Sequence, residues 1–63
     1  MKTIKTFENG ERLVKLLLNE NDNTYTVNLI THNGTTGAIY KSKFYAERKF
    51  NEYKYYPLNA IKF

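Results

Sequence analysis

Apolar and polar residues alternate along the first two thirds of the chain, a pattern typical of strands in a half-buried antiparallel sheet. The alternation is clearest over residues 12–18 and 24–31, where apolar or aromatic side chains recur at every second position. Residues 2–7 and 36–41 are predicted as two further strands. We therefore expect a four-stranded antiparallel meander within residues 2–41.

Two Asn-Gly pairs, Asn9-Gly10 and Asn33-Gly34, separate the predicted strands at the positions of hairpin turns. Asn-Gly favours such turns because a type I′ turn needs positive φ at both central residues. A two-residue turn at the second pair predicts three opposed pairs across the last two strands: Thr31 with Thr36, Leu29 with Ala38, and Val27 with Tyr40.

A four-residue loop over residues 20–23 would join the two central strands. It predicts three opposed pairs: Leu18 with Tyr25, Leu16 with Val27, and Val14 with Leu29. Directly opposed residues share a face of the sheet, so this register gathers one apolar core face. The first hairpin stays open between two registers. A two-residue turn brings Phe7 to the core face, whereas a three-residue turn with a bulge brings Ile4 there.

Residues 43–55 are predicted to form a helix that covers the core face. Ala46, Phe50 and Tyr53 recur at i, i+4 and i+7, which is the spacing of one helical stripe. One helix across one face of an antiparallel sheet is a common two-layer arrangement. The predicted fold class is α+β, with the order ββββα in one domain over residues 1–63.

The ends and the outer side of this helix are predicted from single residues. Ser42 is the expected N-cap, because its hydroxyl can accept from a backbone N–H of the first turn. Pro57 ends the helix by disfavouring helical geometry at the residue before it. Arg48 and Glu52 are expected to pair at i, i+4 on the outer side. The apolar tail over residues 57–63 could form an extra edge strand, cover the second sheet face, or dock into another copy.

Three aliphatic side chains converge on the second face of the predicted sheet, among lysines, threonines and an asparagine, and a fourth lies nearby. The three are Leu13, Ile30 and Ile39, and the fourth is Leu17. Scattered aliphatics on a sheet surface are ordinary, but a contiguous group is typical of a surface that another element or chain covers. We interpret these four residues as a self-association patch, with a homodimer as its product.

The chain has 63 residues and no cysteine, which excludes disulfides and thiolate metal sites. A chain of this length buries only about 60% of the surface that its unfolded form exposes. The core must therefore be supplemented by regular packing or by self-association. The single histidine, His32, precedes a turn and is interpreted as a solvated residue. No metal or other cofactor is expected.

No feature of the sequence favours a membrane. The N-terminal residues are not followed by the apolar run of a signal peptide, and the longest apolar run, residues 16–18, is far shorter than the ~20 residues that span a bilayer. A soluble, cytoplasmic protein is expected.

The excess of positive charge lies in the last third of the chain. The formal net charge is +4, and the cations and anions of residues 1–38 cancel. Beyond them, cations interleave with aromatic side chains. The predicted partner-binding residues there are Lys41, Lys43, Tyr45, Arg48, Lys49, Lys54, Tyr55 and Tyr56. Exposed tyrosines with a basic rim favour another protein as the partner. Nucleic acid is the second choice, because lysines attract phosphate and tyrosine rings stack on bases.

The sequence gives little indication of an enzyme. No cysteine nucleophile exists, and the only serine, Ser42, is explained by capping. The acidic residues fall in predicted turns or on the helix surface, whereas paired carboxylates need a sheltered cleft for acid–base work. The acidic loop over residues 20–23 lacks the spacing of an EF-hand. We therefore expect a binding protein and not an enzyme.

In size and in its Lys-, Asn- and Tyr-rich composition the chain resembles short orphan proteins of low-GC phages and mobile elements. The resemblance extends over the whole chain and concerns composition, not a motif. It implies an inhibitor that binds a host protein, such as a defence nuclease. The net charge of +4 argues against mimicry of DNA, which requires an acidic surface.

Overall fold

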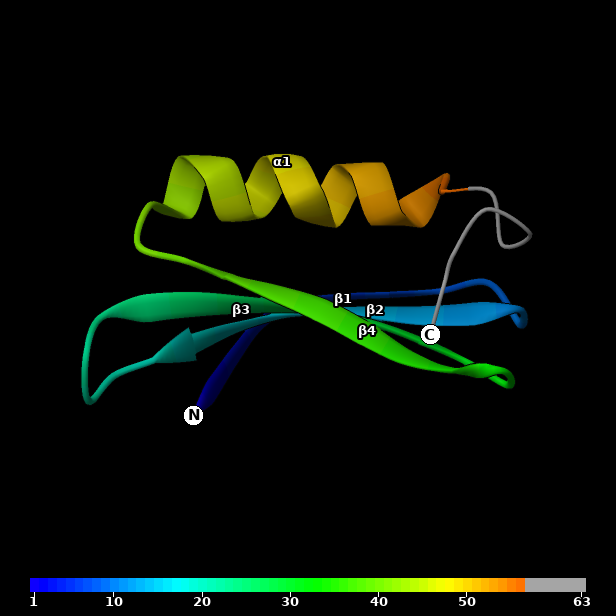
Figure 1. The fold of residues 1–63 in the computed structure, drawn as a ribbon, viewed down its shortest axis with the longest axis horizontal. Coiled ribbons are helices and arrows are strands. Elements are labelled where there is room, and N and C mark those ends of the chain that lie inside the picture. The colour runs from blue at the N-terminus through cyan, green and yellow to red at the C-terminus, as the bar shows by residue number, and fades with distance from the viewer. Residues whose placement is uncertain (57–63) are drawn as a thin grey trace.

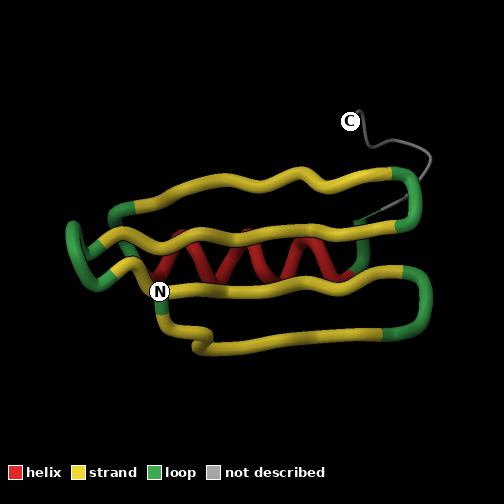
Figure 2. The backbone as a smooth tube through the Cα atoms, turned by 90° about the horizontal axis from the view of Figure 1, so that it is seen from below, coloured by secondary structure: helices red, strands yellow, loops and turns green. Residues whose placement is uncertain are grey.

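A four-stranded sheet with one helix packed on it forms the structure, a computed structural model that describes residues 1–56. The strands are β1 (Lys2–Glu8), β2 (Arg12–Asn19), β3 (Thr24–Thr31) and β4 (Gly34–Tyr40), and the helix is α1 (Lys43–Lys54). All neighbouring strands are antiparallel and follow the order β1-β2-β3-β4 (Figures 1 and 2). The predicted ββββα architecture is confirmed. The predictions for the tail, residues 57–63, fall outside the described residues.

The core lies between α1 and the two central strands. Four strand side chains are fully buried: Val14, Leu16, Val27 and Leu29. The helix contributes the predicted stripe of Ala46, Phe50 and Tyr53, with exposed fractions of 0, 3 and 8%. This packing explains why a helix of modest propensity forms at all, since short helices gain most of their stability from burying an apolar face.

The pairing of β2 with β3 follows the predicted register. Leu18 lies opposite Tyr25, Leu16 opposite Val27, and Val14 opposite Leu29. The loop between them begins after Asn19 and ends before Thr24, so it has the expected four residues. Asp22 closes this loop by accepting hydrogen bonds from the backbone N–H and the hydroxyl of Thr24, at 3.3 and 2.7 Å.

The pairing of β3 with β4 differs from the predicted register by two residues. Three observed pairs are Leu29 with Thr36, Val27 with Ala38, and Tyr25 with Tyr40. The prediction was wrong because the turn is formed by His32 and Asn33, neither of which has positive φ, and Gly34 is already the first residue of β4. Gly34 has a φ of 145°, a conformation that suits glycine. A shift of two residues leaves every side chain on its predicted face.

The first hairpin combines the two registers that the sequence left open. Gly10, with a φ of 87°, and Glu11 form the turn, and the side chain of Asn9 accepts from the N–H groups of Glu11 and Arg12. Phe7 therefore lies opposite Val14 on the core face. The pairing then shifts between Thr3 and Lys5. Ile4 occupies this bulge, and both Ile4 and Phe7 are half-buried against the core.

Two predictions about α1 need correction. Ser42 occupies the N-cap position with an extended backbone, but its hydroxyl makes no capping hydrogen bond; its carbonyl accepts from the N–H of Ala46 at 3.1 Å. Glu52 pairs with Lys49 at 3.1 Å and not with Arg48. The guanidinium of Arg48 lies over the ring of Phe44 instead, 5.8 Å from its centroid.

Candidate interaction surface

The eight predicted partner-binding residues divide between the two ends of α1. Lys41, Lys43, Tyr45 and Arg48 lie at or near its N-terminal end, and Lys49, Lys54, Tyr55 and Tyr56 lie at or beyond its C-terminal half. Tyr45 and Tyr55 are separated by about 15 Å along the axis, at 1.5 Å per residue. The eight residues therefore extend along the whole length of α1 and do not form one compact cluster.

At the C-terminal end, two of these side chains pack against the core. The ammonium of Lys54 lies over the rings of Phe7 and Phe50, 5.4 and 5.6 Å from their centroids. Tyr56 is half-buried and meets the ring of Tyr53 edge to face, with centroids 6.0 Å apart. At this end of α1, Lys54 and Tyr56 therefore stabilise the fold through cation–π and aromatic contacts.

Lys49 is half-buried, and its ammonium interacts with two side chains of α1. Its ammonium donates a hydrogen bond to the Glu52 carboxylate at 3.1 Å and lies 5.4 Å from the centroid of the Tyr53 ring. The hydrogen bond to Glu52 raises the pKa of Lys49 above its ordinary value. Burial raises the pKa of Tyr53, because the phenolate loses hydration there. Of the C-terminal group only Tyr55, 79% exposed, presents its side chain fully to solvent.

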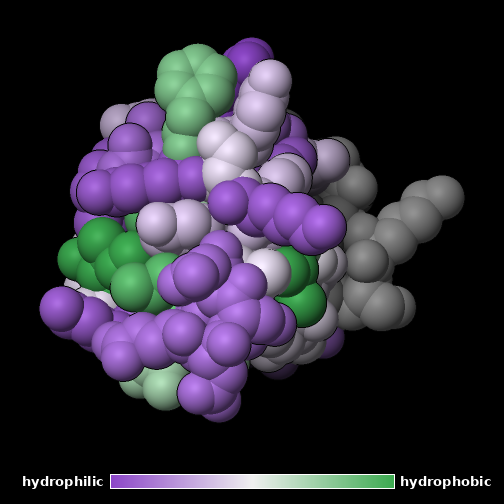
Figure 3. Space-filling model, turned by 90° about the vertical axis from the view of Figure 1, so that its left-hand side faces the viewer, coloured by the Kyte–Doolittle hydropathy of each residue, from purple (hydrophilic) through white to green (hydrophobic). Residues whose placement is uncertain are grey.

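At the N-terminal end, two aromatic side chains are presented outward on α1. Phe44 and Tyr45 are 63% and 55% exposed, and their rings meet edge to face with centroids 5.3 Å apart. Arg48 covers the ring of Phe44 from the next turn. We call Phe44, Tyr45 and Arg48 the aromatic cluster. Figure 3 views the molecule from this end and shows hydrophobic areas set among predominantly hydrophilic side chains.

Phe44 was not among the residues predicted to bind a partner. Its displacement from the stripe of Ala46, Phe50 and Tyr53 was visible in the sequence. That displacement is the feature that could have identified it, since a phenylalanine off the buried stripe of a single helix has no core position to fill.

The N-terminal end of α1 is also electropositive. Lys41 and Lys43 are exposed there, and no acidic residue lies in the first turn of the helix. The unpaired N–H groups at a helix N-terminus carry partial positive charge, which adds to these cations. An acidic partner would match this end of the molecule.

Arg12 performs a structural task that the sequence did not reveal. It is 9% exposed, and its Nη1 donates a 2.7 Å hydrogen bond to the carbonyl oxygen of Tyr53 in the last turn of α1. A cation at the C-terminal end of a helix is favoured by the helix dipole. Arg12 therefore ties the first hairpin to α1, and among residues 1–56 its Nε has no hydrogen-bond partner.

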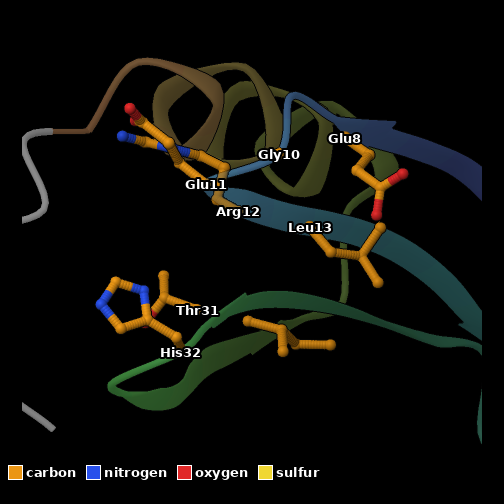
Figure 4. Close-up of a pocket in the computed structure, with 8 residues that line it drawn as sticks. Glu8, Gly10, Glu11, Arg12, Leu13, Thr31 and His32 are labelled. Atoms are coloured by element: carbon orange, nitrogen blue, oxygen red, sulfur yellow. The ribbon is translucent and has the colours of Figure 1, made fainter.

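A surface pocket of about 190 Å³ lies beside Arg12, at the end of the sheet where two hairpins turn (Figure 4). Glu8, Glu11 and His32 are its titratable neighbours, and all three are exposed. In Figure 4 the Glu11 carboxylate points away from Glu8 and from His32. Within the described part of the chain, no group of three or more His, Cys, Asp or Glu side chains is arranged to hold a metal ion.

The four residues of the predicted self-association patch share the sheet face opposite α1. Leu13, Leu17 and Ile30 are half-buried, and Ile39 is 67% exposed. Leu13 lies directly opposite Ile30. In the part of the chain that the structure covers, no helix packs on this face, which is turned toward the viewer in Figure 2. All four residues therefore share the predicted face, but they do not converge as predicted. The corrected β3–β4 register places Ile39 opposite Thr26, four residues along β3 from Ile30.

Comparisons with protein families, with curated proteins and with solved structures found no match. Across residues 1–56, no helix is long and apolar enough to cross a membrane. Functional interpretation therefore depends on the surface itself.

Proposed function

We propose that this protein is a non-enzymatic protein-binding module that contacts an acidic surface of its partner with the N-terminal end of α1. The observation that supports the proposal is the exposure of Phe44 and Tyr45, side by side, on a helix whose core stripe is already complete. Burying two such rings in a partner would remove a large apolar area from water.

The residue types of the aromatic cluster are those that dominate protein interfaces. Tyrosine and arginine are enriched among the few interface residues that carry most of the binding energy. Arg48 already lies against Phe44, so part of the entropy of ordering its side chain is lost before binding. Less ordering remains to oppose association.

The lysines beside the aromatic cluster would orient an acidic partner and raise the rate of encounter with it. Lys41 and Lys43 flank the aromatic cluster at the electropositive end of α1. Complementary charge mainly raises the association rate and excludes wrong partners. An acidic protein surface with an apolar pocket is the partner that this arrangement fits.

The compositional resemblance to short phage proteins suggests the biological setting. In that setting the partner would be a host protein, and the module would inhibit it by occupying an acidic surface. Self-association through Leu13, Leu17, Ile30 and Ile39 remains a separate proposal, since these residues lie on the face away from α1.

Nucleic acid is the alternative partner. Lys41, Lys43 and Arg48 beside Tyr45 would suit phosphates and an unstacked base. Two features weaken this alternative. Lys49 and Lys54 are directed toward Tyr53 and Phe7. Glu47 adds a carboxylate to the same helix, where it pairs with Lys5 of β1 at 3.6 Å.

The test is capture of partners from a nuclease-treated lysate by the immobilised full chain, compared with a Phe44→Ala/Tyr45→Ala variant. We expect a protein that is retained by the wild type and lost by the double variant. Tyr55→Ala is the matched control, because Tyr55 is the more exposed aromatic at the other end of α1. Equal loss with Tyr55→Ala, or retention by the double variant, would contradict the proposed surface.

Salt dependence separates the two classes of partner. Binding to nucleic acid falls by about one log unit per log unit of salt for each phosphate neutralised. We expect no retention of short single- or double-stranded DNA at physiological salt, measured by fluorescence anisotropy. Tight, salt-sensitive binding that requires Lys41, Lys43 and Arg48 would favour nucleic acid instead.

A further inference from the structure

The two edge strands of the sheet differ in how they are protected from pairing. β1 carries Lys2, Lys5 and Glu8, and its ladder is interrupted by the bulge at Ile4. Charges and bulges are the usual devices that stop an edge from adding another strand. β1 therefore has both.

β4 has neither device. Its seven residues, GTTGAIY, include no charged side chain and no proline, and its pairing with β3 runs from Gly34 to Tyr40 without a bulge. Within the described residues its outer edge has no strand beside it, so alternate residues present unpaired N–H and C=O groups. The fully buried strand residues beneath α1 belong to β2 and β3. The helix also contacts β4, but it lies over the face of the sheet and not along the outer edge of β4 (Figures 1 and 2).

We propose that β4 pairs antiparallel with β4 of a second copy of this chain, forming one continuous eight-stranded sheet. A two-fold axis perpendicular to the sheet would pass through Gly37, so that Thr35 lies opposite Ile39 of the other copy. This register overlaps the whole of β4. Both helices then lie on the same side of the sheet, and the two open faces become continuous.

The side chains of β4 suit this register. On the open face, exposed Thr35, Gly37 and Ile39 would meet Ile39, Gly37 and Thr35 of the other copy. On the helix side, Tyr40 would lie opposite Gly34 of the other copy. The largest residue of the strand would then face a glycine, which leaves room for its ring. β-branched pairs across strands stabilise a sheet, and Ile39, 67% exposed in one copy, gains a neighbour.

Charge does not oppose this pairing locally, although each copy carries a net charge of +4. The cation nearest to β4 in the sequence is Lys41, and this register places it opposite Asn33 of the other copy. Like charges therefore do not meet across the new ladder. Pairing is independent of the proposed function, because it uses no residue of the aromatic cluster.

Directed cross-linking tests the register. The chain contains no cysteine, so Thr35→Cys and Ile39→Cys variants each carry one thiol. Directly opposed residues lie about 4.5–5.5 Å apart between Cα atoms, within disulfide range. We expect a disulfide-linked dimer only when the two variants are mixed and oxidised. In either variant alone the thiols would lie about 13 Å apart, four residues along the strand, and should not link.

Charge variants test the pairing without a cross-link. Thr35→Lys/Ile39→Lys sets ammonium groups opposite each other twice, and we expect dimerisation by sedimentation equilibrium to weaken by about tenfold or more. Thr35→Glu/Ile39→Lys sets opposite charges together at the same sites and should dimerise like the wild type. Thr3→Lys/Thr6→Lys places the same charges on β1 and should leave dimerisation unchanged.

Three results would overturn the pairing through β4. A wild type that stays monomeric at high micromolar concentration would overturn it. A dimer that resists Thr35→Lys/Ile39→Lys but is lost on Ile30→Thr would assign association to the open face. A cross-link formed equally by Thr3→Cys and Thr6→Cys would assign it to β1.

Discussion

The two ends of α1 are built from the same residue types but use them in opposite ways. At the C-terminal end, Lys54 lies over Phe7 and Phe50, and Arg12 bonds the carbonyl of Tyr53. At the N-terminal end, the aromatic cluster is exposed. An interleaving of cations and aromatics is therefore not one surface but two: one end stabilises a thin core, and the other is presented to solvent.

The largest effect is expected where the same substitution is made at both ends. Phe50 is 3% exposed, whereas Phe44 is 63% exposed. Phe→Ala in a core costs about 3–5 kcal/mol, which is most of the stability of a small domain. We expect Phe50→Ala to be largely unfolded at room temperature by circular dichroism. The free energy of unfolding of Phe44→Ala should lie within about 0.5 kcal/mol of the wild-type value. Similar losses in both variants would refute the division of α1 into two ends.

The next effect concerns the two arginines of the chain. Arg12→Ala removes a buried, charge-assisted hydrogen bond and the packing of the aliphatic stem, and we expect a loss of about 2–3 kcal/mol in urea unfolding. Among the residues that the structure describes, the Nε of Arg12 is buried without a hydrogen-bond partner. Its removal recovers the free energy that this desolvation costs, so the expected loss of stability is not larger. Arg48→Ala, at the exposed end, should change stability by no more than about 0.5 kcal/mol. Equal losses in the two variants would show that Arg12 does not anchor α1.

Alkaline pH should destabilise the fold through two groups in the C-terminal half of α1. The pKa of Tyr53 is raised above 10.0 by burial, and that of Lys49 above 10.5 by its hydrogen bond to Glu52. A group with a higher pKa in the folded state stabilises the fold below its unfolded value, and this contribution is lost as pH rises toward the folded value. We expect the melting temperature to fall as pH rises above about 10. The fall should be shallower in Tyr53→Phe; an equally steep fall would assign the effect to other groups.

The sequence predicted the faces of the sheet better than its pairs. The β2–β3 register was right because alternation in both strands and a four-residue loop agree. The β3–β4 register was wrong by two residues because Asn33-Gly34 was taken as the turn. Face assignment survived, since the side-chain period in a strand is two. At the first hairpin, the bulge at Ile4 brings both Ile4 and Phe7 against the core, which no regular register allows.

The candidate surface was predicted by composition, and composition does not tell inward from outward side chains. Lys54 and Tyr56 were grouped with Tyr45 although they pack against core side chains. Lys49 was grouped with it too, although its ammonium is paired with Glu52. Arg12 has the strand parity of Val14 and Leu16, so its place on the core face was readable. Its acceptor was not, because a backbone carbonyl 41 residues away leaves no mark on residue type.

The smallest effect is expected at the N-cap of α1. Replacing a capping serine with alanine ordinarily costs about 0.5–2 kcal/mol, through loss of the bond from its hydroxyl to the first turn. The hydroxyl of Ser42 makes no such bond, although its backbone occupies the N-cap position. We therefore expect Ser42→Ala to lower the free energy of unfolding by less than about 0.5 kcal/mol, measured by urea titration with an unchanged slope.

Ser42→Asp supplies the matched comparison at the same position. A carboxylate there can accept from the N–H groups of the first turn and offset the partial positive charge of the helix end. We expect a gain of about 0.3–1 kcal/mol, because no acidic residue now lies in that turn. A loss above about 1 kcal/mol in Ser42→Ala would show that the hydroxyl caps α1 in solution. The N-terminal end of α1 would then be held as firmly as the C-terminal end, and the contrast between the two would rest on side-chain exposure alone.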